Sequence, residues 1–174
     1  DAIWLARALS EVIDAMDTED KDWEALSELD TADHAQWWQL TAKFLEIASI
    51  YWPARLAELN RSSAGRHRNA ILRAEADRLT KIASTDPIIV AGSTGSIPAA
   101  ADLIAAVASL PHGTVVLPGL DLDMPEDQWQ AINEAPDDAA SRTHSQYGLF
   151  TLLQKLGVLR HDVERIGDLD RDLQ

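Results

Sequence analysis

The chain has 174 residues, 46% of them hydrophobic and 25% charged, a composition typical of a soluble globular protein of one domain or one and a half. It contains no cysteine, which excludes disulfides, thiolate metal sites and cysteine nucleophiles and fits a cytoplasmic protein. The formal net charge of −14 argues against a free-standing DNA-binding domain, because an acidic surface repels phosphate.

The start of the chain is not expected to be a signal peptide. No basic stretch followed by an apolar one opens the sequence, and no apolar run is long enough to cross a bilayer. The chain begins with Asp1 and ends without a recognisable domain boundary. We therefore expect both ends to lie inside a longer polypeptide that has no membrane partner.

The first third of the chain has helical periodicity. Apolar residues recur at helical spacing over residues 2–16, and after an acidic linker a short helix is expected around Trp23. A longer helix is predicted over residues 33–60, and it is apolar around most of its circumference, so we expect it to be buried on more than one side. Pro53 predicts a kink or a fresh start near residues 51–52, because proline lacks the amide donor and clashes with the preceding turn.

Basic residues gather in the next segment, a turn at residues 61–65 followed by a helix predicted over 66–84. Residues 61–81 contain six basic and two acidic side chains, a local charge of about +4 in an acidic chain. The candidates for contact with DNA or a partner protein are Arg61, Arg66, Arg68 and Arg73. The alternative is a helix whose arginines form ion pairs with acidic residues elsewhere in the same domain.

At Pro87 the pattern changes to short, branched apolar runs. Residues 88–91 and 114–117 each predict a buried parallel strand, and Pro98 suits the first turn of the helix between them. Together these segments predict one right-handed β-α-β unit. Two strands do not make a stable sheet, so the rest of the sheet is expected outside the chain or in strands without a clear signature.

The remaining segments predict an acidic loop at 121–127, a short helix around Trp129, an exposed loop at 134–143 and a helix over 146–156 that Gly157 stops. A last turn is expected at 160–166. The predicted fold class is therefore α/β and helix-rich. A helical part at residues 1–86 precedes a partial α/β core with further helices at residues 87–174.

The loop between the first predicted strand and its helix is the sharpest local feature. Its members, which are candidates for contact with an anion or phosphate, are Gly92, Ser93, Thr94, Gly95 and Ser96. Small residues let backbone amides approach an anion, and a helix start favours negative charge. A P-loop would need a lysine after its last glycine, and here Ser96 and Ile97 follow Gly95. The alternative is a tight turn packed against a neighbouring element.

Other motifs with catalytic or metal-binding chemistry are weak. The acidic residues between Asp121 and Asp127 follow a strand and could hold magnesium, although a solvated loop that caps the next helix is the better explanation. No acid-x-lysine triplet of a nuclease follows, and no two histidines have the spacing of a zinc-binding helix. We therefore expect no catalytic residue, metal or cofactor in this segment.

Three blocks of the sequence resemble the AddB family of double-strand break repair proteins. The first two run from Pro87 to Ala99 and from Leu110 to Asp121, and the third, from His144 to Leu149, resembles a His-Pro-Gln segment in that family, with Ser145 in place of the proline. Arg68 to Leu72 also fits a family pattern. The resemblance covers roughly residues 60–165.

This resemblance implies an internal segment of the helicase-like amino-terminal half of an AddB subunit. Its partners would be AddA, the remaining domains of AddB, and DNA in the complete helicase–nuclease. The segment itself would be a scaffold for handling DNA, because the nuclease motif and any iron–sulfur cysteines lie elsewhere in that family. The competing hypotheses are a small phosphate- or nucleotide-binding α/β enzyme domain and a protein-interaction module.

Overall fold

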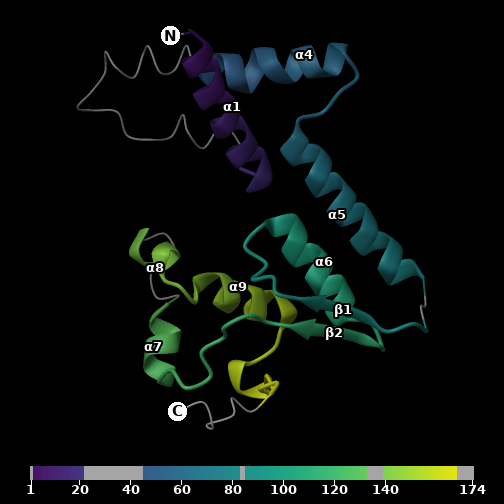
Figure 1. Cartoon of the computed structure of the whole chain (residues 1–174), viewed down its shortest axis with the longest axis vertical. Coiled ribbons are helices and arrows are strands. Elements are labelled where there is room, and N and C mark those ends of the chain that lie inside the picture. The colour runs from purple at the N-terminus through teal and green to yellow at the C-terminus, as the bar shows by residue number, and fades with distance from the viewer. Residues whose placement is uncertain (1, 22–44, 83–84, 133–138, 168–174) are drawn as a thin grey trace. The chain divides into compact units, whose positions relative to one another are not determined.

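The structure, a computed structural model, describes residues 2–21, 45–82, 85–132 and 139–167 (Figure 1). It is helix-rich, with one small parallel sheet, and this confirms the predicted fold class. Two compact units divide the chain. The first comprises residues 1–75 with 97–99, and the second comprises residues 76–96 with 100–174. The predicted boundary at residues 86–87 coincides with the change from helix to strand, whereas the compact units divide inside a helix.

The first unit contains α1 (Ala2–Thr18), a π-helical segment η1 (Ile47–Tyr51), α4 (Trp52–Glu58) and most of α5 (Ala64–Lys81). The helix does not make the fresh start that Pro53 could predict: it continues through residues 45–58, with a change from π-helical to α-helical geometry at Trp52. Pro53 occupies the first turn of α4, where its missing amide donor is not needed. The turn before it widens, so that the Trp52 amide donates to the Ile47 carbonyl. The helix expected around Trp23 lies outside the described residues.

Three helices end in the same way. Asp20 after α1 and Asn60 after α4 have a φ of 51°, and Gly157 after α9 (Tyr147–Leu156) has a φ of 65°. In each case the amide of the next residue donates to the carbonyl five residues back, at 2.8–3.1 Å. This is the Schellman motif, which glycine usually makes and which aspartate and asparagine tolerate better than most other residues. An acidic side chain is thereby fixed in the turn after α1.

The apolar helix before Asn60 is less buried than its composition predicts. Ala48 is buried, but Ile50, Tyr51 and Trp52 are exposed in the described structure. The expectation of burial on more than one side is therefore wrong for residues 45–60. The physical reason is that η1 and α4 present only one face to packing partners among the described residues, so the opposite apolar face stays in solvent.

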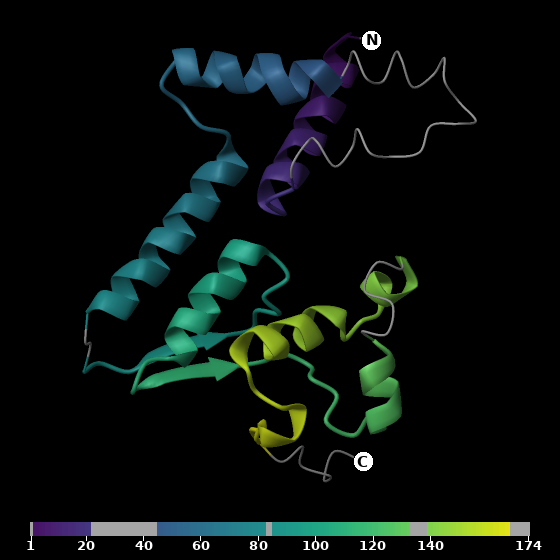
Figure 2. The ribbon, with the colours of Figure 1, turned by 180° about the vertical axis from the view of Figure 1, so that it is seen from behind.

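The second unit is built on one β-α-β crossover. β1 (Ile88–Ala91) pairs in parallel with β2 (Gly113–Val116), and α6 (Pro98–Ala108) connects them (Figure 2). Val90 lies opposite Val115 in the register. After the sheet come α7 (Glu126–Ala131), α8 (Ala139–Thr143), α9 (Tyr147–Leu156) and a 3-10 turn η2 (Arg160–Asp162).

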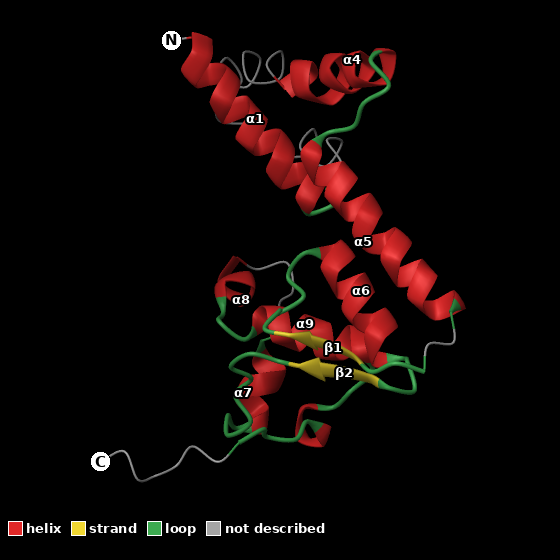
Figure 3. Ribbon diagram, turned by 45° about the vertical axis from the view of Figure 1, so that its right-hand side comes forward, coloured by secondary structure: helices red, strands yellow, loops and turns green. Residues whose placement is uncertain are grey.

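Helices α6 and α9 cover the same face of this sheet. Ile104 of α6 and Leu152 of α9 form a buried cluster against Val90 and Val115 of the strands. In Figure 3 both helices lie behind the two strands. A second cluster joins α7 to α9, with Trp129 and Phe150 at a ring-centroid distance of 5.1 Å. The core of this unit therefore lies between α9 and its neighbours.

Two sequence predictions in the second unit are wrong. The strands are not fully buried, because Ile89 is 66% exposed and Thr114 beside it is exposed as well. Helices lie on only one face of the sheet in the described structure, so the other face is open. Residues 139–143 form α8 instead of an exposed loop, and Ala139 and Ala140 at its start have high helix propensity. Residues 133–138 lie outside the described part.

No helix among the described residues is both long and apolar enough to cross a membrane.

Candidate functional site

The Gly92–Ser96 loop lies at the carboxyl end of β1 and leads into α6, the place where open α/β sheets bind their ligands. Gly92 has a φ of 79° and Gly95 has a φ of 64°. Both angles lie in the left-handed region, which a side chain with a Cβ adopts only at a cost. The two glycines are therefore required by the backbone of the turn, independently of any ligand.

The loop uses part of its hydrogen-bonding capacity within the chain. The Gly92 amide donates to the Val116 carbonyl at 3.1 Å, which extends the pairing of β1 with β2. The Gly95 amide donates to the Ser93 hydroxyl oxygen at 3.2 Å. An anion at this loop would therefore find two of its five backbone donors already engaged.

Helix α9 packs directly against the loop. Gly95 is buried, and a Cβ built on it would lie 2.8 Å from Cδ1 of Leu152, which is itself buried. One turn earlier in α9, a Cβ on Gly148 would lie 3.8 Å from Thr94. These are the contacts expected of a tight turn packed against a neighbour. Anion contact by residues 92–96 stays a prediction.

The loop after β2 also contacts the start of α9. The side-chain oxygen of Gln146 accepts a hydrogen bond from the Asp121 amide at 3.1 Å, and its side-chain nitrogen donates to the Gly119 carbonyl at 3.0 Å. Gln146 thus holds this loop through its backbone. The three sequence blocks singled out above therefore meet around the amino-terminal half of α9, although the role of Gln146 could not be read from the sequence.

The acidic loop is stabilised from within. One carboxylate oxygen of Asp121 accepts from the amides of Asp123 and Met124, at 3.0 and 2.9 Å. The Asp123 carboxylate in turn pairs with Arg165 at 2.8 Å. No group of three or more histidines or carboxylates within the described ranges is placed to hold a metal ion. These contacts are those of a structural loop that precedes α7.

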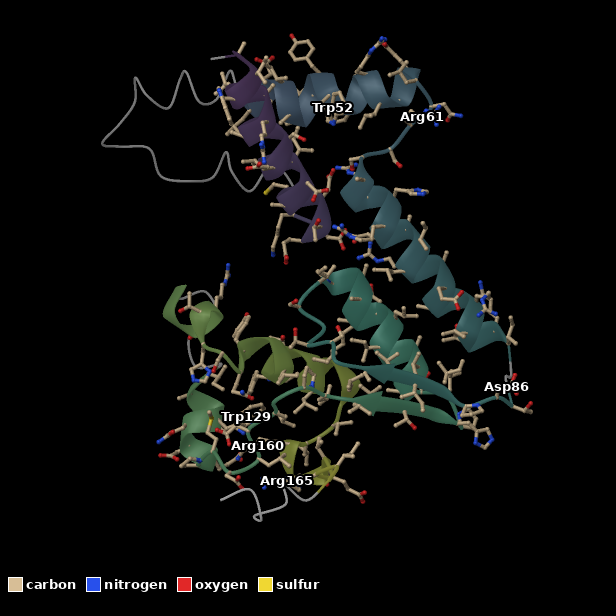
Figure 4. The ribbon with its side chains drawn as sticks, viewed as in Figure 1. Trp52, Arg61, Asp86, Trp129, Arg160 and Arg165 are labelled. Atoms are coloured by element: carbon tan, nitrogen blue, oxygen red, sulfur yellow. The ribbon has the colours of Figure 1, made fainter. Side chains whose placement is uncertain are left out.

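Arg160 connects this loop to the aromatic core (Figure 4). Its side chain is only 10% exposed, lies over the Trp129 ring at 4.9 Å, and donates to the Asp121 carbonyl at 3.1 Å and to Glu126 at 2.8 Å. The hydrogen bond from Gln130, followed by the contact with Arg160, lowers the pKa of Glu126 below its usual range. The buried guanidinium thus makes structural contacts with the loop, with α7 and with the Trp129 ring.

In the first unit, three of the four candidate arginines contact the end of α1. Arg66 pairs with Asp17 at 2.8 Å, Arg68 donates to the Thr18 hydroxyl, and Arg73 forms a fork with the Asp20 carboxylate. Arg61 is exposed in the turn after α4 (Figure 4). Two of the four arginines, Arg66 and Arg73, thus pair with acidic residues of the same domain, and contact of the four with DNA or a partner stays a prediction.

Asn69 of α5 fixes the end of α1. Its side chain is 2% exposed, and its amide nitrogen donates to the carbonyls of Asp17 and Thr18 at 2.9 and 3.2 Å and to the Asp20 carboxylate at 3.2 Å. These carbonyls are among those that a helix leaves unpaired at its carboxyl end. Cationic arginines next to that end also interact favourably with the helix dipole. Asn69 and the arginines therefore form one polar joint between the two helices.

The two ion pairs of this joint differ in their surroundings. The Asp17 side chain is 6% exposed and accepts both Arg66 and the Ser63 hydroxyl, the latter at 2.5 Å. The Asp20 and Arg73 side chains are 36% and 43% exposed. The Arg66 side chain is itself 59% exposed, so water screens its charge, and each of the two ion pairs contributes about 0–1 kcal/mol. What distinguishes Asp17 is its burial, where the hydrogen bonds from Arg66 and Ser63 offset the loss of hydration.

Acidic residues of α1 also change the electrostatics of the basic stretch. The end of α1 carries four acidic residues, Asp14, Asp17, Glu19 and Asp20. They face a helix that carries three of the candidate arginines, with Lys21 following in the chain. The local charge of about +4 counted along the sequence is thus largely cancelled in space.

Comparison with known proteins adds no relative. No family model, no curated protein and no solved structure matches the chain. Function must therefore be inferred from the geometry and from the resemblance of the three sequence blocks.

Proposed function

We propose that the chain is a non-catalytic segment of an AddB subunit, within the helicase-like half of an ATP-dependent helicase–nuclease. That complex resects double-strand DNA breaks for recombinational repair. In this proposal the segment is cytoplasmic and requires no cofactor of its own. Its partners are AddA, the remaining domains of AddB, and DNA in the complete complex.

The observation that carries this proposal is the packing of α9 at the carboxyl ends of the two strands. Leu152 lies against Gly95, and Gln146 binds the loop around Gly119, so α9 contacts both loops at the edge of the sheet where a ligand would approach. A nucleotide-hydrolysing enzyme would need a lysine for the outer phosphates. A loop that lacks this lysine and packs through Gly95 against a helix supports a scaffold.

The open face of the sheet supports an incomplete domain. Parallel sheets occur almost only with helices on both faces, and two-stranded sheets are marginal in isolation. Here α6 and α9 cover one face, while Ile89 and Thr114 on the other face are exposed in the described structure. A further layer from the other domains of AddB would bury this face.

Co-purification tests this proposal. The tagged chain is co-expressed with AddA and with the remaining domains of AddB as a separate polypeptide, and captured complexes are analysed. We expect the partners to be retained, and Ile89→Lys on the open sheet face to abolish retention. Ile166→Lys is the matched control, because Ile166 is 73% exposed and lies outside both the sheet and the basic helix α5. Failure of the unaltered chain to retain either partner would refute the proposal.

The competing function is a small phosphate- or nucleotide-binding enzyme domain. The glycine-rich turn before α6 favours it, because the first turn of a helix supplies unpaired amide donors. Calorimetric titration of the chain with ATP and magnesium separates the two functions, and we expect no heat of binding and no hydrolysis. Micromolar binding or measurable turnover would replace the scaffold with the enzyme.

A further inference from the structure

In the joint between α1 and α5, the Arg73 guanidinium binds a carboxylate. In a DNA-binding protein, an arginine would bind a phosphate in the same way. Arg73 reaches the two oxygens of Asp20 with both of its terminal nitrogens. Arginine forks bind carboxylates and phosphates in the same bidentate way, since both groups present two oxygens at similar spacing. Asp20 therefore occupies the terminal nitrogens of Arg73, one of the four arginines that are candidates for contact with DNA or a partner.

Asp20 is placed so that it can release this arginine without unfolding α1. It follows the last turn of the helix, with a φ of 51°, and its side chain is partly exposed. The buried Asp17, bound by Arg66 and Ser63, and the amide of Asn69 keep the helix end attached to α5 independently of Arg73. Rotation of the Asp20 side chain therefore withdraws this carboxylate from Arg73 while the end of α1 stays attached to α5.

We propose that Asp20 is an intramolecular competitor of DNA phosphate for Arg73, so that the end of α1 restrains DNA contact by α5. This inference rests on the proposed DNA-handling function and adds its regulation. When a DNA backbone approaches α5, Arg73 exchanges the Asp20 carboxylate for a phosphate oxygen, while Arg66 stays on Asp17. The exchange makes and breaks only hydrogen bonds and ion pairs, and no covalent bond changes.

The chain offers a matched pair of variants to test this restraint. Asp20→Asn removes the competing charge, keeps the size of the side chain, tolerates the left-handed backbone and retains an oxygen for the Asn69 amide. Glu19→Gln removes the same charge from the neighbouring residue, whose exposed side chain is not one of the partners of Arg73 described above. Any difference between the two variants therefore reports on the position of the charge.

The experiment measures binding of a labelled single-stranded DNA oligonucleotide to the 174-residue chain by fluorescence anisotropy at two salt concentrations. We expect Asp20→Asn to tighten binding about five-fold at low salt and to raise the salt slope by about one phosphate contact. Glu19→Gln should tighten binding less than about two-fold, since screening weakens a charge that is not in contact. Adding Arg73→Gln to Asp20→Asn should cancel the gain.

Three outcomes would overturn the restraint: equal tightening by both single variants, a gain that survives Arg73→Gln, or no DNA binding by any variant. Circular dichroism checks that each variant is folded. If Asp20→Asn unfolds, Asp20→Gly replaces it with the same expectation, because glycine suits a positive φ. A negative result here leaves the co-purification test of the proposed function untouched, so the two failures are distinguishable.

Discussion

Gly95→Ala tests whether the glycine-rich loop is a packing element. Two costs follow from the structure. The φ of 64° imposes about 1–2 kcal/mol on a residue with a Cβ. The new methyl group would also lie 2.8 Å from Cδ1 of Leu152, and forcing an extra carbon into a packed core costs about 1–3 kcal/mol. Leu152 is 2% exposed and has little room to move. We expect a total loss of about 2–5 kcal/mol.

Urea unfolding followed by far-UV circular dichroism measures this loss, and Gly92→Ala is the matched control. Gly92 has a φ of 79°, but no atom lies within 4 Å of its ideal Cβ position, so only the backbone cost of about 1–2 kcal/mol applies. Leu152→Ala combined with Gly95→Ala should cost less than the sum of the single variants, because the smaller side chain makes room. Equal losses for Gly92→Ala and Gly95→Ala would refute the packing of α9 on the loop.

Three further predictions concern the polar contacts. Asn60→Gly should raise the free energy of unfolding by about 0.5–1 kcal/mol, because glycine adopts the positive φ at this position without strain. Asp20→Gly should give no such gain, because it also removes the contacts of Asp20 with α5. Thermal unfolding of the two variants compares these effects. Arg160→Met should lower the free energy of unfolding by about 2–3 kcal/mol, measured by urea unfolding. Arg165→Met, at an exposed ion pair, should lower it by about 0–1 kcal/mol. The pKa of Glu126 is lower in the folded protein than in the unfolded chain, so its contribution to stability is present above the unfolded-state pKa and is lost as the pH falls through the folded-state pKa. Glu126→Gln should therefore flatten the acid side of the stability profile, and an unchanged profile would contradict this.

The position of most elements follows from local sequence. The branched run at 88–91 forms β1, Pro98 begins α6, and Gly157 ends α9 in the left-handed conformation expected of it. Pro53 likewise marks the start of α4. Such features depend on backbone sterics and on missing donors within one or two turns, so they can be predicted without knowledge of distant neighbours.

Burial could not be predicted in the same way. The run Ile88–Ala91 is wholly apolar, which is typical of a strand covered on both faces, yet Ile89 is exposed. Similarly, the apolar residues around Tyr51 do not lie in a core in the described structure. The sequence shows how much free energy an apolar side chain would gain if it were buried. Whether it is buried depends on whether other elements of the structure cover it.

The candidate sites show the same division between sequence and tertiary structure. The sequence by itself determined that residues 61–81 are basic and helical and that Gly92–Ser96 is a turn without the lysine of a nucleotide-binding loop. Only the tertiary structure paired Arg66 and Arg73 with carboxylates 49 and 53 residues away, and only it placed Leu152 on Gly95. The reason is that electrostatic and packing energies depend on distances in space, whereas sequence patterns report distances along the chain.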